Sequence, residues 1–301
     1  MIRFEEFTKR FGTQTAVDSV SFAVEEGEAV ALLGPNGSGK TTTLKAAAGL
    51  IRPTSGRAWI GCPERDALSP DARDAVSYLP QRVSFPEALT GLEVVEFYRR
   101  LRGVREERSK QVLRLASLNG ASARPIGTYS GGMIQRLGLA VAALPDAPVL
   151  ILDEPTAALD PDGLCAFYGL VDRRRREGRT LLFSSHQLGD VERLADRFLV
   201  LVSGRLAATF TRGELSERLA ARGVMRLSFA APVSGLLEKV RRLAPGATWS
   251  GDTLIVPGPA EERARVLDVV RAEGGEIRSL VAEEARLDSL YQELVGVKEA
   301  E

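Results

Sequence analysis

Short apolar runs separated by helix-like stretches are the main pattern in the first two hundred residues. The apolar runs "EAVALLG", "VLILDEP", "TLLFSS" and "FLVLVSG" predict buried strands at 28–34, 149–155, 180–185 and 198–204. The residues of 40–50 predict a helix that ends near Gly49. Buried strands bounded by helices are typical of a mainly parallel sheet that helices cover on both faces.

Three further regions have patterns of their own. Residues 3–28 alternate short strands and turns, which predicts an antiparallel β part, and residues 86–145 predict a helical subdomain. After a polar helix at 211–223, residues from 224 onward follow the order βαββαβ, the ferredoxin-like arrangement, with a last helix at 284–295. We therefore expect an α/β domain over 1–216 and a small α+β accessory domain over 224–297.

Composition narrows the function classes. Apolar residues make up 44% of the 301 residues, which is enough for a packed core. Lys plus Arg and Asp plus Glu are both 40, so no basic excess points to a nucleic-acid partner. The two cysteines are 103 positions apart and form no CxxC pair, which is typical of a reduced cytoplasmic chain. No apolar stretch reaches the ~20 residues of a spanning helix, so we expect no membrane span.

The stretch "GPNGSGKT" matches the pattern G-x-x-x-x-G-K-[ST] between a predicted strand and a predicted helix. Its glycines let backbone N–H groups point inward as an anion nest, its lysine brings a positive charge to the outer phosphates, and its threonine offers a hydroxyl to Mg²⁺. The candidate phosphate-binding residues are Gly34, Pro35, Asn36, Gly37, Ser38, Gly39, Lys40, Thr41 and Thr42.

Two acids end the predicted strand at 149–155. Asp153 is positioned to hold Mg²⁺, directly or through water, and Glu154 faces differently, which makes it the candidate general base. The alternative is that the pair caps the next helix. His186 follows another strand of the same predicted sheet, at the edge where ligands bind in open parallel sheets, and could contact the γ-phosphate and the attacking water.

The segment "TYSGGMIQR" begins a predicted helix with Ser130, Gly131 and Gly132. One interpretation is a flexible helix entrance. The other is an anion site, because free N–H groups lie at a positive helix end with no side chain in the way.

The chain resembles the ATP-binding subunits of ABC transporters over about residues 1–210, because the phosphate loop, the Ser-Gly-Gly helix start, the Asp-Glu strand end and His186 follow one another in that order. The resemblance implies that Phe11 stacks on adenine, that Gln81 contacts Mg²⁺ and the attacking water, and that Asp160 lies in a loop crossing a dimer interface. Ser130, Gly131 and Gly132 would be the signature motif, although Tyr129 and Met133 replace the usual flanking leucine and glutamine. The intact Ser-Gly-Gly still predicts activity.

The resemblance also implies a Mg²⁺-dependent ATPase. Two copies would bind ATP head to tail, each signature helix meeting the γ-phosphate held by the other copy. The chain would lie in the cytoplasm, held at the inner face of the membrane by a membrane-spanning transporter subunit. A soluble ABC ATPase acting on ribosomes or in DNA repair, and an ordinary P-loop kinase or GTPase, are the alternatives.

A finer resemblance is to exporter-type subunits. Within them the chain is similar to the ATPase that serves copper-site maturation of nitrous-oxide reductase. The chain's two Cys, three Met and one His never cluster, so any copper would be handled by partners.

Overall fold

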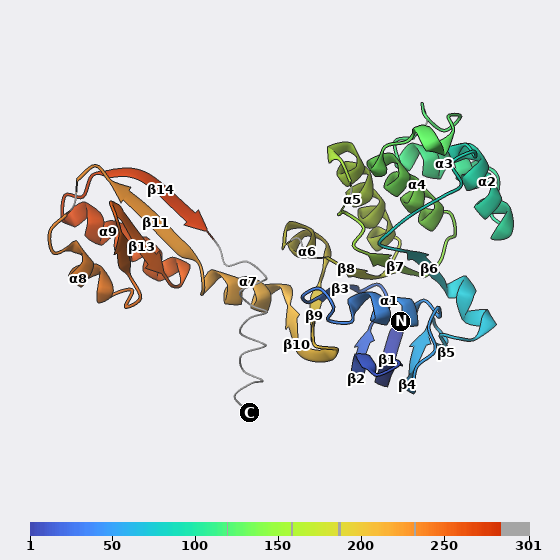
Figure 1. The fold of residues 1–301 in the computed structure, drawn as a ribbon, viewed down its shortest axis with the longest axis horizontal. Coiled ribbons are helices and arrows are strands. Elements are labelled where there is room, and N and C mark those ends of the chain that lie inside the picture. Colours follow the sequence, from blue (N-terminus) through green and yellow to red (C-terminus); the bar gives the residue numbers. More distant parts are fainter. Residues whose placement is uncertain (119, 158, 186–187, 232, 284–301) are drawn as a thin grey trace. The chain divides into compact units, whose positions relative to one another are not determined.

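The structure is a computed structural model that describes residues 1–118, 120–157, 159–185, 188–231 and 233–283. The chain separates into two compact units, Met1–Thr209 and a second unit from Phe210 onward, which are described separately (Figure 1). Within the described residues, no helix combines the length and the apolar character that crossing a membrane requires.

The first unit is organised around a six-stranded sheet, counted over the described residues, with strand order β10-β9-β3-β8-β7-β6. Its strands are β3 Ala29–Leu33, β6 Val76–Leu79, β7 Val149–Asp153, β8 Thr180–Ser184, β9 Arg197–Val202 and β10 Arg205–Thr211. The neighbours β9-β3, β3-β8, β8-β7 and β7-β6 pair in parallel. Every residue of β3, β7 and β8 is buried, as continuous apolar runs predict, and the mainly parallel sheet is confirmed.

A second sheet of this unit has the order β2-β1-β4-β5 and is antiparallel. Its strands are β1 Ile2–Phe11, β2 Gln14–Val24, β4 Ser55–Ile60 and β5 Arg65–Asp66. Helix α1 (Lys40–Ala47) contacts β2 and β4 of this sheet and β7 and β8 of the parallel sheet. Leu44 on α1 packs into one apolar core with Phe4, Phe7 and Leu32, so the core fixes α1 between the two sheets.

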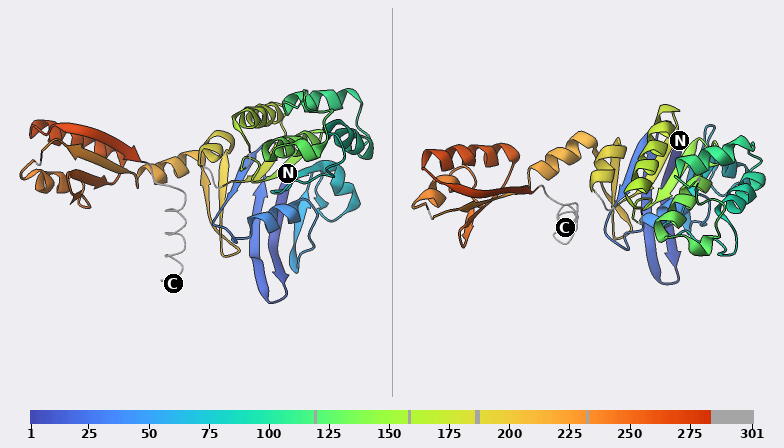
Figure 2. Two further views of the ribbon diagram at one scale, coloured as in Figure 1. Left: turned by 45° about the horizontal axis from the view of Figure 1, so that its top comes forward. Right: turned by 90° about the horizontal axis from the view of Figure 1, so that it is seen from above.

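Helices of residues 91–143 form a cluster that stays together in both views of Figure 2. It comprises α2 Gly91–Leu101, α3 Glu107–Leu115 and α4 Gly131–Ala143, which contact one another. Short 3-10 turns lie at η1 Pro70–Ala75 and η2 Ile126–Thr128, and the remaining helices of the unit are α5 Pro161–Arg176 and α6 Leu188–Leu194. A capping box of Thr90 and Glu93 begins α2, and the Ser130 hydroxyl caps α4.

The second unit includes helix α7 (Arg212–Ala220) and a βαββαβ arrangement whose antiparallel sheet has the order β12-β13-β11-β14. Its elements are β11 Val224–Phe229, α8 Leu236–Arg241, β12 Thr248–Ser250, β13 Thr253–Pro257, α9 Ala260–Ala272 and β14 Ile277–Glu283. Alternate residues of β11 are buried, so one sheet face forms a core with Leu236, Val240, Val266 and Val270 of the helices. The predicted last helix, 284–295, lies outside the described residues.

Candidate active site

The loop between β3 and α1 depends on two glycines whose place no other residue could take without strain. Gly34 has φ 148°, and a Cβ there would lie 2.2 Å from the carbonyl oxygen of Leu201. Gly39 has φ 100°, and a Cβ there would lie 2.5 Å from the carbonyl oxygen of Ala16. The backbone therefore approaches its neighbours as closely as a glycine allows, which gives the loop its curled shape.

Helix α1 presents a positive end to the solvent side of this loop. Gly39 is its N-cap residue, no side chain caps it, and its first turn holds no acidic residue. The Lys40 ammonium donates to the carbonyl oxygens of Gly34 (2.8 Å) and Pro35 (3.0 Å), and the residue is only 6% exposed. Burial lowers the pKa of Lys40, while the carboxyl groups of Glu154 and Asp153 act in the opposite direction. The arrangement suits an anion.

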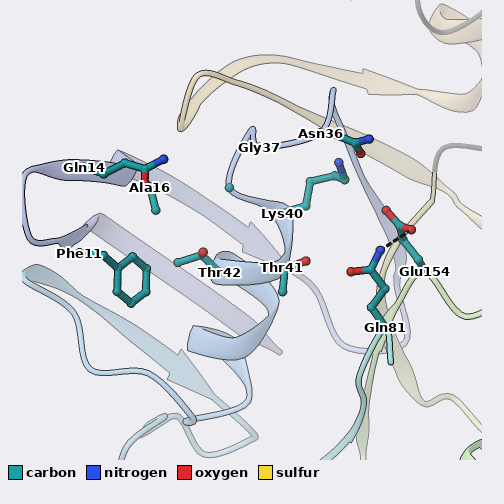
Figure 3. A pocket seen from close by; sticks show the side chains of 11 residues that line it. Phe11, Gln14, Ala16, Asn36, Gly37, Lys40, Thr41, Thr42, Gln81 and Glu154 are labelled. Atoms are coloured by element: carbon teal, nitrogen blue, oxygen red, sulfur yellow. Dashed lines mark hydrogen bonds between the residues drawn. The ribbon is translucent and has the colours of Figure 1, made fainter. Parts of the chain in front are cut away.

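An open pocket of about 490 Å³ lies over the loop (Figure 3). Phe11 lies on one side of it and Gln81 with Glu154 on the other, with Thr41 between. Its lining residues are Phe11, Gln14, Ala16, Asn36, Gly37, Gly39, Lys40, Thr41, Thr42, Gln81 and Glu154. The structure thus brings together, over more than 140 positions of sequence, most of the residues predicted to bind nucleotide.

Asp153, at the end of β7, is 1% exposed. Its Oδ1 accepts hydrogen bonds from the hydroxyls of Ser184 (2.8 Å) and Thr41 (3.3 Å), and its buried Oδ2 accepts none of good geometry from the residues that the structure describes. The Tyr78 phenol lies nearby, and burial together with the Asp153 carboxylate raises its pKa. Burial raises the pKa of Asp153, against the effect of the Ser184 and Thr41 hydroxyls. A carboxylate oxygen without a hydrogen bond of good geometry beside a hydroxyl fits Mg²⁺, which takes one or two protein carboxylates together with phosphate and water oxygens.

Glu154 has φ 46°, the left-handed region, which costs a non-glycine residue of order 1 kcal/mol or more. Its backbone N–H donates to the Ser184 hydroxyl (2.9 Å), and its Oε2 accepts from Gln81 Nε2 (2.8 Å). The side chain lines the pocket, whereas that of Asp153 is buried beneath it. The Glu154 carboxylate can therefore contact a molecule in the pocket, whereas that of Asp153 is shielded from it.

The predicted residues outside the loop, its neighbouring strands and Gln81 lie elsewhere. Ser130 and Asp160 are outside the set of described residues that line the pocket; they cap α4 and α5, where Asp160 Oδ2 lies 3.5 Å from Arg136 Nη2 of α4. Ser130 and Gly131 are exposed, and a Cβ on Gly131 would meet open space. His186 lies outside the described residues.

Sequence reasoning missed Ser184, Gln14 and Ala16. Ser184 ends β8, and its hydroxyl contacts both the Asp153 carboxylate at the end of β7 and the backbone N–H of Glu154 just after it. Its only signal was a polar residue at the end of a buried strand. Gln14 and Ala16 come from β2 and reach the pocket through the hairpin that also carries Phe11, a contact that no local pattern indicates.

Replacing Asp153 by Asn should stabilise the chain when the pocket is empty. An aspartate whose folded-state pKa is raised favours its protonated form in the fold, so stability is lost as pH rises through that pKa, and at pH 7 the buried charge is a cost. We expect a gain of about 1 kcal/mol, or a melting temperature about 2–4 °C higher in chelator. A lower melting temperature for the Asn variant would contradict the view that the buried Asp153 charge destabilises the fold.

Comparisons with known proteins agree with this geometry. The family model described as ABC transporter matches residues 17–157. An uncharacterised ABC transporter ATP-binding protein of Bacillus subtilis, YxlF, is 39% identical over 79% of this chain and 80% of its own length. The daunorubicin resistance ATP-binding protein DrrA3 of Streptomyces coeruleorubidus is 32% identical over 97% of this chain and 96% of its own length.

Solved structures give the same result. The ATP-binding subunit of an ABC transporter matches with a TM-score of 0.65 and 29% identity, over 70% of this chain and 90% of that one. A dimeric post-hydrolysis ATP-binding cassette bound to ADP and Pi matches with a TM-score of 0.65 and 26% identity, over 70% of this chain and 99% of that one. The chain belongs to the ATP-binding proteins of ABC transporters, and it is an ATPase of this class.

Proposed function

We propose that two copies of this chain bind ATP head to tail and that their closing and opening drive a separate membrane-spanning exporter subunit. One observation carries the proposal. The phosphate loop and the Ser130 end of α4 are both built to face an anion, yet Ser130 lies outside the pocket over its own phosphate loop. A second copy supplies the phosphate that the exposed helix end lacks.

Within this proposal, Phe11, which is 52% exposed at the pocket wall, stacks on adenine. Lys40 and the loop N–H groups bind the outer phosphates. Thr41, Asp153 and Gln81 would hold Mg²⁺, which would supply positive charge to offset that of the phosphates. Glu154 takes a proton from the water that attacks the γ-phosphorus as the bond to the ADP oxygen breaks, giving ADP and phosphate.

The other parts of the site act on the partner copy's nucleotide or next to the water. Ser130, Gly131 and Gly132 bind the partner's γ-phosphate, and Asp160 lies at the interface between the copies. His186 contacts the γ-phosphate. Hydrolysis removes the charge that holds the two copies together, so it weakens the closed state.

The proposed direction of transport is outward. The relatives' names include Nod factor export, linearmycin resistance and daunorubicin resistance. Such a partner would hold the chain at the cytoplasmic face of the membrane. The role in copper-site maturation of nitrous-oxide reductase stays a prediction.

Helix α2 offers the surface that we propose for the membrane partner. It buries Val94 and Val95, whereas Phe97 (60%) and Leu101 (67%) are exposed and line a hollow together with Glu93, Glu96 and Arg100. Exposed large apolar side chains on one helix face are typical of a docking surface.

The double substitution Phe97→Ser/Leu101→Ser should therefore remove the membrane subunit from detergent co-purification while the ATPase rate of the isolated chain stays within about twofold. Leu50→Ser is the matched control, because Leu50 is equally exposed (61%) but lies outside α2. Retention of a polytopic partner by the double variant would reject this surface. Co-purification of ribosomal or DNA-repair proteins alone would reject the transporter function.

A further inference from the structure

Asp190 is a buried acid that no step of the proposed mechanism uses. It lies on α6 and is 3% exposed. Within the described part of the chain, three hydroxyl groups donate to its carboxyl oxygens: Tyr168 to Oδ1 (2.5 Å), Thr156 to Oδ2, and Ser185 to Oδ2 (3.3 Å). The donors come from three separate segments, so one side chain joins α5, the segment after β7 and the segment after β8.

Two of these segments carry the chemistry of the site. Thr156 lies two residues after Glu154, and Ser185 follows Ser184, whose hydroxyl contacts both Asp153 and the Glu154 N–H. Hydrogen bonds therefore link the ends of β7 and β8 at two places, one through Ser184 and the other through Asp190. Glu154 lies between these two places.

Glu154 needs such support because of its backbone. Its φ of 46° is a conformation that persists only where the surrounding structure over-determines it. The Ser184 hydroxyl holds its N–H on one side, and the Thr156 hydroxyl bonded to Asp190 fixes the chain on the other.

We propose that Asp190 is a positioning residue that acts through Thr156 to hold Glu154 in its left-handed conformation over the nucleotide pocket. The proposal rests on the proposed role of Glu154 as general base.

The surroundings of Asp190 keep this tie rigid. Burial, together with the hydrogen bond to Asp190, raises the pKa of Tyr168 to about 12, so at pH 7 the phenol is a donor. The Arg193 guanidinium lies over the Tyr168 ring, 3.9 Å from its centroid. Thr156, Ser185 and Asp190 are all 5% exposed or less, so water does not compete for the bonds.

The test is Thr156→Val, which keeps the shape of the side chain and removes its hydroxyl. We expect kcat for ATP hydrolysis to fall about tenfold with KM and the Kd for ATP within twofold, because the phosphate loop is untouched. Thr156→Ser, which restores the hydroxyl, should recover most of the rate. Ser77→Ala is the control for loss of a buried hydroxyl, because Ser77 donates to the Ala142 carbonyl (2.7 Å) away from the pocket; its kcat should stay unchanged.

Combining Thr156→Val with Glu154→Gln shows whether the effect passes through Glu154. The double variant should hydrolyse ATP as slowly as Glu154→Gln alone, measured in single turnover. A further tenfold loss, an unchanged kcat for Thr156→Val, or an equal loss in Ser77→Ala would overturn the positioning role. Wild-type turnover by Glu154→Gln itself would instead overturn the proposed base.

Discussion

Glu154→Gln is expected to lower kcat by about 10²–10⁴-fold, the contribution of a general base, while ATP still binds. The amide cannot accept the proton from the attacking water, but it fills the same space beside Gln81. ATP then stays intact between two copies. Size-exclusion chromatography with light scattering should therefore find this variant as a dimer in ATP and Mg²⁺, and as a monomer in ADP.

The control is Lys40→Ala in the same background. Lys40 is held by the Gly34 and Pro35 carbonyls at the pocket floor, so its loss should remove ATP binding and the dimer with it. A Glu154→Gln chain that stays monomeric in saturating ATP would rule out the ATP-bridged dimer, whatever its rate of hydrolysis.

Ser130→Arg should lower hydrolysis by about 10²-fold or more, the scale of losing an anion-binding group in a phosphoryl-transfer site. Ser130 caps α4 and is exposed, so arginine fits sterically but blocks the approach of a phosphate to the helix end. Because Ser130 does not line the pocket of its own chain among the described residues, the Kd of the monomer for ATP should change less than twofold.

Mixing Ser130→Arg chains with Lys40→Ala chains tests directly whether Ser130 acts on the nucleotide of the other copy. Each variant alone should be inactive. In a head-to-tail mixed dimer, one site combines the intact phosphate loop of the first variant with the intact Ser130 of the second, so activity should return with mixing. Two Lys40→Ala samples mixed together give the background. No recovery in verified mixed dimers would place Ser130 outside the partner's site.

The parts of the fold that follow from local chemistry were predictable from the sequence. Continuous apolar runs gave β3, β7 and β8, and the glycine pattern with Lys40 located the loop over which the pocket lies. The strand-like and helix-like stretches from 224 onward, with a Ser-Gly-Asp turn between two short strands, predicted the order of elements in the second unit. These features are encoded within a few neighbouring residues.

The hydrogen bonds that hold the segment around Glu154 could not be predicted from the sequence in this way. Ser184 and Asp190 meet the segment after β7 across about thirty positions of sequence. Serine, threonine and aspartate at strand ends have many roles, so their presence does not name a partner. The positive φ of Glu154 was equally hidden, because glutamate does not ordinarily adopt it.

The far end of α4 has a consequence for how the two copies engage. Guanidinium groups of Arg108 and Arg174 both donate to the Ala143 carbonyl (3.0 Å each), which fastens α4 to α3 and α5. Near its other end, Arg136 pairs with Asp160 at the start of α5. These contacts join α4 and α5 at two places along their length, so we expect the two helices to move together. In the proposed dimer, a displacement of α4 would therefore move Asp160 together with Ser130, and the two proposed contacts with the other copy would be lost together.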